Sequence, residues 1–234
     1  MSTDLTIPTL TMAERRILGV MVEKAKTTPD VYPLSINSLV TGSNQKSNRE
    51  PILNLSDEDV ENTLAGLQPK GYVTRIQGGR VERWRHNLYD VWSVNKVELA
   101  ILAELLLRGP QTEGELRQRA SRMEPIDDLD ALRAALKPLA ERKLVVFLGP
   151  EGRRGTLITH GFHADKEIEV LRSRASSEEA LAAAPTVSSS WASAEQVAKL
   201  EADLVALKAQ MRELSDALAY TKQQLQTLKD SLGG

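Results

Sequence analysis

The 234-residue chain contains no cysteine, and this absence excludes several classes of site at once. A protein without thiols has no disulfide scaffold, no cysteine nucleophile and no cysteine-ligated zinc or iron–sulfur centre. The chain also lacks the run of about 18–20 apolar residues that a membrane span requires, because Glu104 interrupts its longest apolar stretch, 99–107. No basic segment precedes an apolar one at the N-terminus, so we predict no signal peptide and expect a cytoplasmic protein.

The chain also lacks an excess of positive charge. It has 30 Lys and Arg against 32 Asp and Glu, and 41% of its residues are hydrophobic, as in an ordinary globular protein. The net charge is 0 over residues 1–94, +1 over 95–163 and −3 over 164–234. Strong binding to nucleic acid without sequence preference requires clustered positive charge, which no segment has.

The sequence does contain a pattern of three helices followed by a hairpin. In the first half, apolar residues at helical spacing predict helices that begin after three hydroxyl side chains: Thr11, Ser35 and Ser56. A polar loop over 43–54 precedes the third helix. Strands around a glycine turn predict a hairpin within 72–86. Residues 27–33, which include two prolines, are predicted to form a loop or a short strand.

The same order of elements occurs again after residue 95. A helix over 95–108, a short helix that begins at Thr112, a leucine-rich helix from Leu129 and a hairpin within 145–159 align with the first set, at offsets of 84, 77 and 72 residues. This order is that of a winged helix-turn-helix domain. We therefore predict a mainly helical α+β fold with two tandem winged-helix domains, at 10–92 and 95–163. A second apolar strip on helix 95–108 indicates packing against the first domain or another subunit.

The last part of the chain predicts a different structure. Residues 164–192, rich in alanine and serine, are interpreted as a linker. Residues 193–232 are predicted to form a coiled-coil helix whose seam alternates in steps of three and four. Because a long exposed apolar stripe is unfavourable, we expect a homo-oligomer, in the first instance a dimer, held by the seam residues Val197, Leu200, Leu204, Leu207, Met211, Leu214, Leu218, Leu225, Leu228 and Leu232.

Three segments carry a family resemblance. The stretch TTPDVYPLSINSLVTGSNQKSNREP (Thr27–Pro51), the stretch LLLRGPQTEGELRQR (Leu105–Arg119) and the RWRH that ends the first hairpin (Arg83–His86) resemble the signature of the uncharacterised bacterial YceH family. The resemblance extends from Leu10 to about Phe162. It implies a tandem winged-helix fold and a C-terminal heptad segment, and it implies no established biochemical activity.

Few residues suggest catalysis or metal binding. His160 and His163, with Asp165 nearby, offer metal ligands, but they follow a predicted strand rather than lie on one helix face, so no metal site is expected. The turn Gly149–Gly155 is glycine-rich like a phosphate-binding loop, yet it lacks the Gly-Lys-Ser/Thr ending and precedes no helix. We predict a protein without enzymatic activity or a cofactor.

Two functions remain open from the sequence. The first is DNA binding or transcriptional regulation through basic hairpins, and the residues that would contact DNA or another partner are Lys46, Asn48, Arg49, Arg75, Arg80, Arg83, Arg85, Arg153 and Arg154. The polar loop over 43–54 can equally be held by its own hydrogen bonds. The second is a protein-interaction scaffold, because both third helices begin with acidic residues, which would face DNA phosphates unfavourably.

Overall fold

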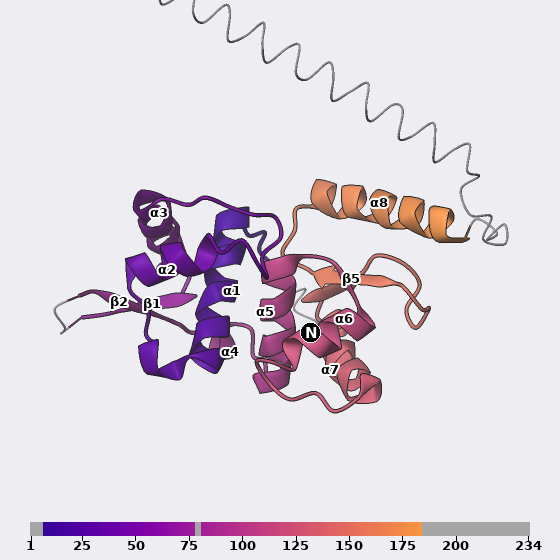
Figure 1. Cartoon of the computed structure of the whole chain (residues 1–234), viewed down its shortest axis with the longest axis horizontal. Helices are drawn as coiled ribbons and strands as arrows, with labels where there is room; N and C mark the ends of the chain where they lie inside the picture. Colours follow the sequence, from indigo (N-terminus) through magenta and orange to yellow (C-terminus); the bar gives the residue numbers. More distant parts are fainter. Residues whose placement is uncertain (1–6, 78–80, 184–234) are drawn as a thin grey trace, which may run out of the picture. The chain divides into compact units, whose positions relative to one another are not determined.

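The first half of the structure consists of helices followed by an antiparallel hairpin (Figure 1). The computed structural model describes residues 7–77 and 81–183, with side chains described up to 177. The elements of this half are α1 (Met12–Thr27), the 3-10 helix η1 (Pro29–Val31), α2 (Ile36–Ser43), α3 (Asp57–Leu67), β1 (Val73–Ile76), β2 (Arg83–His86) and α4 (Leu88–Val91). The segment predicted as a loop or short strand contains η1, since a proline suits the first turn of a helix. Helix α4 was not predicted.

The second half repeats the order of three helices and a hairpin, adds a short strand after its first helix and ends in a long helix. Its elements are α5 (Lys96–Arg108), β3 (Gln111–Thr112), α6 (Glu113–Ala120), α7 (Leu129–Glu141), β4 (Val145–Phe147), β5 (Leu157–His160) and α8 (Asp165–Ala183). The structure is thus a mixed α+β fold, mostly helical, with small antiparallel sheets. The expected fold class is confirmed at this level.

The helices of the two halves begin at matching residues. Thr11 caps α1 and Asn95 caps α5, each accepting a hydrogen bond from the backbone of a glutamate three residues on, which returns the bond to form a capping box. The second and third helices also begin at side-chain N-caps in matching pairs, namely Ser35 with Thr112 and Ser56 with Asp128, and Thr112 and Ser56 form capping boxes as well. Each pair is separated by the offset that the sequence alignment predicts, so the capping residues mark where the matching helices of the two halves begin.

The hairpins of the two halves also share a register. Val73 pairs with His86 in the first half, and Val145 pairs with His160 in the second. In the second half β3 adds a third strand beside β5. In the first half Leu34 occupies the corresponding place, where it exchanges two backbone hydrogen bonds with Trp84 at 3.0 and 2.7 Å. Each hairpin is therefore held to the segment between the first and second helices of its own half.

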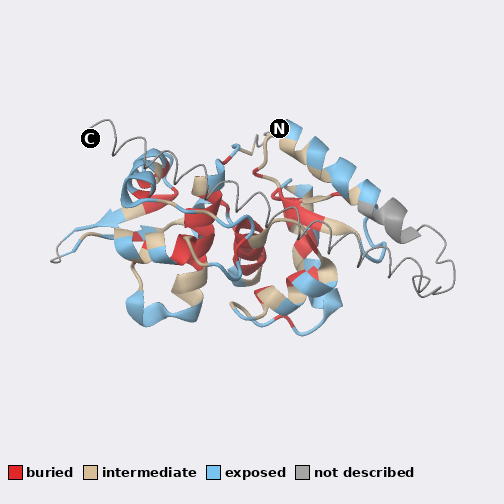
Figure 2. Ribbon diagram, turned by 45° about the horizontal axis from the view of Figure 1, so that its top comes forward, coloured by how far each residue is buried: buried red, intermediate tan, exposed pale blue. Residues whose placement is uncertain are grey.

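The two halves are joined by α1 and α5, which lie side by side at the centre of this unit (Figures 1 and 2). Both helices are buried along most of their length, and the core is one cluster that includes Ile17 of α1 and Ile101 of α5. The second apolar strip predicted on helix 95–108 thus faces the first half. The helices approach closely because Gly19 has no side chain: a Cβ there would lie 2.9 Å from Leu107 Cγ.

The C-terminal part departs from the sequence prediction where it is described. The sequence predicts a linker over 164–192 and no helix there, but α8 occupies Asp165–Ala183. Alanine favours helix, and Glu167 accepts a hydrogen bond from the backbone N–H of Ala164 at 3.1 Å, which helps the helix to begin. The predicted coiled-coil helix over 193–232 lies outside the described residues. None of the helices described could cross a membrane.

The contact between α1 and α5 gives a prediction about two glycines. We expect Gly19→Ala to lower the free energy of unfolding by about 1–2 kcal/mol, because its methyl group would displace the buried Leu107 side chain. Gly66→Ala in α3 is the matched control, since no atom lies within 4 Å of a Cβ there; it should raise stability by up to about 1 kcal/mol. Urea unfolding followed by circular dichroism measures both. Equal effects of the two substitutions would contradict close packing at Gly19.

Candidate functional site

The arginines of the first hairpin do not share one surface. The register of β1 and β2 places Arg83 and Arg85 on the exposed face and Trp84 on the buried face. Arg75 is paired with Trp84 across the strands, so it lies on the same face of the hairpin as Trp84 and opposite to Arg83 and Arg85. It forms an ion pair with Glu82. Arg83 donates a hydrogen bond to the backbone carbonyl of Pro33 at 2.7 Å, which fixes it to the segment after η1. Arg80 lies outside the described residues.

Among the hairpin arginines that the structure describes in this half, Arg85 remains available to a partner. It is exposed, and no hydrogen bond or ion pair holds it within the described part of the chain. The second hairpin presents Arg153 and Arg154, both exposed, in the turn that joins β4 to β5. This turn joins two paired strands, so it is the hairpin connection that the sequence predicts.

The polar loop over 43–54 is held by contacts with α1, α2 and α5. Arg49 is buried, donates two hydrogen bonds to Glu23 of α1 at 3.2 and 2.6 Å, and reaches the carbonyl of Gly42 at 3.0 Å. Asn48 accepts a hydrogen bond from Arg108, and its φ of 61° is a conformation that asparagine tolerates. Arg49 and Asn48 therefore hold the fold together in this structure, whereas Lys46 is exposed.

The third helix of the first half presents an acidic face. The exposed residues of α3 include four carboxylates and no lysine or arginine: Asp57, Glu58, Asp59 and Glu61. Asp59 also completes the capping box of the helix, and hydrogen bonds from Ser56 lower the pKa of its carboxyl group. At neutral pH this face is negatively charged.

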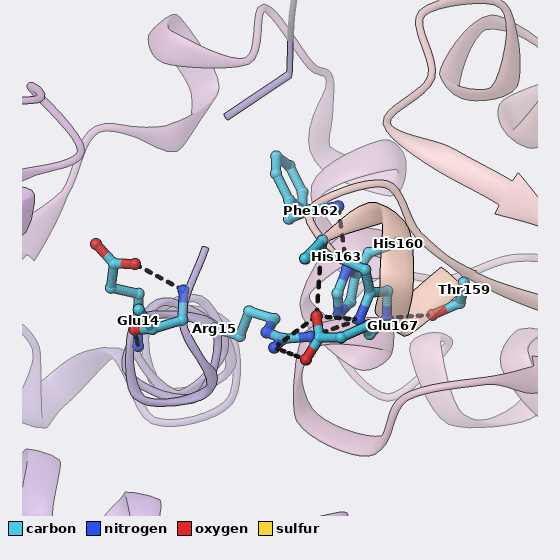
Figure 3. A network of polar contacts seen from close by, with 9 residues as sticks. Glu14, Arg15, Thr159, His160, Phe162, His163 and Glu167 are labelled. Atoms are coloured by element: carbon cyan, nitrogen blue, oxygen red, sulfur yellow. Dashed lines mark hydrogen bonds and ion pairs between the residues drawn. The ribbon is translucent and has the colours of Figure 1, made fainter. Parts of the chain in front are cut away.

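A polar network that the sequence did not predict joins α1, the end of β5 and α8 (Figure 3). Arg15 of α1 donates to His163 Nδ1 at 2.5 Å and to both carboxylate oxygens of Glu167 at 2.9 and 3.2 Å. His163 Nδ1 also lies 3.2 Å from Glu167 Oε2, and His163 Nε2 forms a hydrogen bond with Thr159 Oγ1 at 3.0 Å. His160 stacks on His163 with ring centroids 3.9 Å apart.

This network is unsuited to a metal ion. The guanidinium of Arg15 occupies the Nδ1 side of His163 and would repel a cation. Asp165, the third candidate ligand, takes no part in the network. Within the residues described, no three histidine or carboxylate side chains gather closely enough to hold a metal.

The histidines of the protein are uncharged when it is folded at neutral pH. Burial lowers the pKa of His86 to about 4, with a smaller effect of Lys26. Burial also lowers the pKa of His160 strongly, aided by His163 and Arg15. Burial is the main cause that lowers the pKa of His163; Arg15 lowers it further and Glu167 opposes the shift. His86 and His160 occupy matching positions in the two hairpins, since each pairs with the first valine of its hairpin.

A cleft of about 570 Å³ lies beside this network; we call it the junction cleft. Residues of α1, α5, α8 and the loop around Pro51 line it. Its walls are mostly apolar, formed by Met12, Pro51, Leu105, Leu106, Pro110, Val170 and Leu171. Its charged residues are Arg15, Arg16, Glu50, Arg108, Lys166, Glu167 and Arg174. Neither the cleft nor α8 was predicted from the sequence.

Arg16 is the most deeply buried cation of the junction cleft. Its side chain donates to the carbonyl oxygens of Ser43 at 2.9 Å and of Pro51 at 2.5 Å, and no carboxylate forms an ion pair with it in the described part of the chain. Its Nε is buried without a hydrogen-bond partner there. Burial and the nearby charge of Arg49 lower the pKa of Arg16 to about 10, so it remains positively charged at neutral pH.

Comparisons with known proteins place the chain among uncharacterised relatives. Residues 10–152 match the model of a family described as a protein of unknown function, DUF480. A UPF0502 protein of Rhodopirellula baltica is 47% identical over 76% of this chain and 75% of its own length. A UPF0502 protein of Xanthomonas campestris is 35% identical over 96% of this chain and 98% of its own length. The predicted resemblance to an uncharacterised bacterial family is confirmed.

The buried histidines predict that the protein loses stability in mild acid. Their pKa values are lowered in the folded state, so below about pH 6.5 the unfolded chain binds protons that the folded chain does not. Each histidine then reduces the free energy of unfolding by up to about 1.4 kcal/mol per pH unit. His86→Gln should lower the slope measured by urea unfolding between pH 6.5 and pH 5. An unchanged slope would show that His86 is not buried in its neutral form.

Proposed function

The chain belongs to the DUF480 family of uncharacterised bacterial proteins, and we propose that it is a non-enzymatic tandem winged-helix protein that binds another protein. The winged-helix assignment is supported by the order of elements in each half, by the hairpin after the third helix and by the strand position beside each hairpin. The closely packed α1 and α5 make the two modules one unit, which suits a scaffold better than two modules that bind independently.

The acidic face of α3 is the main observation that favours a protein partner over DNA. In a winged helix that reads DNA, the third helix enters the major groove, and cations near it neutralise the phosphates. Here that helix presents Glu58 and Glu61 with their acidic neighbours, and Arg49 of the preceding loop is buried in its ion pair with Glu23. Such a surface would repel DNA and would attract a protein surface that carries lysine or arginine.

The proposal that the protein is not an enzyme is supported by two polar groups of the junction cleft, His163 and Glu167, which other side chains hold. A general base needs a nitrogen or oxygen that can take up a proton from a substrate. Both ring nitrogens of His163 are engaged, and Glu167 accepts two hydrogen bonds from Arg15. Arg15 and Arg16 are donors that hold other parts of the chain.

DNA binding through the hairpins is the second candidate, favoured by the exposure of Arg85 and Arg154 at the two hairpins. Such contacts would go to backbone phosphates and would weaken steeply with salt. Oligomerisation through residues 193–232 stays a prediction from the sequence, because these residues lie outside the described part of the chain. It is compatible with either function.

One purification experiment separates the two functions. We expect tagged full-length protein, isolated from an extract of its own cells after nuclease treatment, to retain a stoichiometric protein partner. Glu58→Lys/Glu61→Lys should lose this partner, because the substitutions reverse the charge of the α3 face. Glu141→Lys/Glu151→Lys, which reverses two exposed acids of the second half, is the matched control and should retain it.

The opposite outcome would support DNA binding instead. The proposal would be contradicted if nucleic acid copurifies with the wild-type chain before nuclease treatment and Arg85→Ala reduces the amount that copurifies. Titration of a labelled duplex at low salt gives the same comparison in a purified system. Arg83 is less suitable for this test, because its substitution also removes the bond to Pro33.

A further inference from the structure

The junction cleft has the size of a small-molecule site. Its volume of about 570 Å³ falls within the range typical of ligand pockets, and apolar side chains form most of its walls. Two of these side chains are partly uncovered: Met12 is 45% exposed and Val170 is 51% exposed. Exposed apolar surface in a concave site is stabilised when an apolar group covers it. The cleft therefore favours a ligand with an apolar body.

The charges of the junction cleft favour an anion. Five cations line it against two carboxylates, and one of the five, Arg108, forms an ion pair with Glu104 at 2.9 Å. Arg15 is compensated by Glu167, whereas the buried Arg16 is bound by carbonyl oxygens alone. Lys166 and Arg174, one on each side of Val170 along α8, form no ion pair within the described residues. Positive charge in a mostly apolar cleft attracts a negative group more strongly than it would in water.

We propose that the junction cleft binds a small amphiphilic anion, a molecule with an apolar body and one carboxylate, phosphate or sulfonate group. The apolar body covers Met12, Val170 and the adjoining leucines. The anionic group lies near Lys166 and Arg174, within the field of Arg16. Helix α8 forms one wall, and the bonds from Arg15 to Glu167 hold that wall in place. This site does not depend on the proposed protein partner.

Fluorescence titration with anilinonaphthalene sulfonate tests the chemistry of the site. The probe combines an aromatic body with a sulfonate, so the full-length protein should bind it saturably, with one probe in the cleft. Decanoate should displace it, and decyltrimethylammonium, which has the same chain length and the opposite charge, should not. Tighter binding of neutral phenylnaphthylamine than of the sulfonate, or displacement by both competitors alike, would overturn the requirement for an anion.

Two arginines of α8 provide the matched variants. Arg174 lines the junction cleft, whereas Arg172 lines a different depression, beside Ile168 and Asp165. We expect Arg174→Gln to weaken binding of the sulfonate by about three- to tenfold and Arg172→Gln to change it less than twofold. Both residues are exposed, so neither substitution should alter the fold. Equal effects of the two variants would place the probe outside the junction cleft.

A third variant tests the apolar wall independently. Val170→Glu places a carboxylate in the apolar wall that the ligand's apolar body should contact. It should abolish saturable binding of the sulfonate probe. Far-ultraviolet circular dichroism checks that this exposed position leaves the fold intact. If a folded Val170→Glu protein binds the sulfonate as the wild type does, the cleft is not the binding site and the proposal is wrong.

Discussion

The packing of α1 against α5 is the contact on which the rest of the described structure depends. Each helix is the first of its half, and each buries more than one side, so neither half can cover its own first helix. Gly19 allows the two backbones to approach, and the apolar residues of both helices then form one core. The junction cleft follows from the same contact, because α1 and α5 supply walls that α8 completes.

Much of this fold could be predicted from local chemistry. Capping residues and helical spacing are short-range signals, and they located three helices in each half, including the matching caps Ser35 and Thr112. The two apolar faces of helix 95–108 indicated that the halves pack together. Helix α8 was missed because its serines and charged residues give no apolar periodicity, and its place is set by the distant contact between Arg15 and Glu167.

The candidate site was less predictable than the fold. The sequence identifies the cations but does not tell which of them form ion pairs within the fold. Arg49 is paired with Glu23 and Arg75 with Glu82, whereas Arg85 is exposed. Their partners are set by loop geometry and strand register. The cations of the junction cleft come from α1, α5 and α8, so no sequence motif marks them. The acidic start of α3, in contrast, was visible in the sequence, and the structure leaves it exposed.

The dependence of both halves on one helix pair is tested most directly by native-state hydrogen exchange of the full chain in increasing urea. If α1 and α5 form the shared core, the slowest amides of both helices should exchange through the same opening, with equal free energies and equal dependence on urea. The contrary result is that α1 amides exchange through a separate opening of lower free energy while α5 amides stay protected. This result would show two independent modules and would contradict the account.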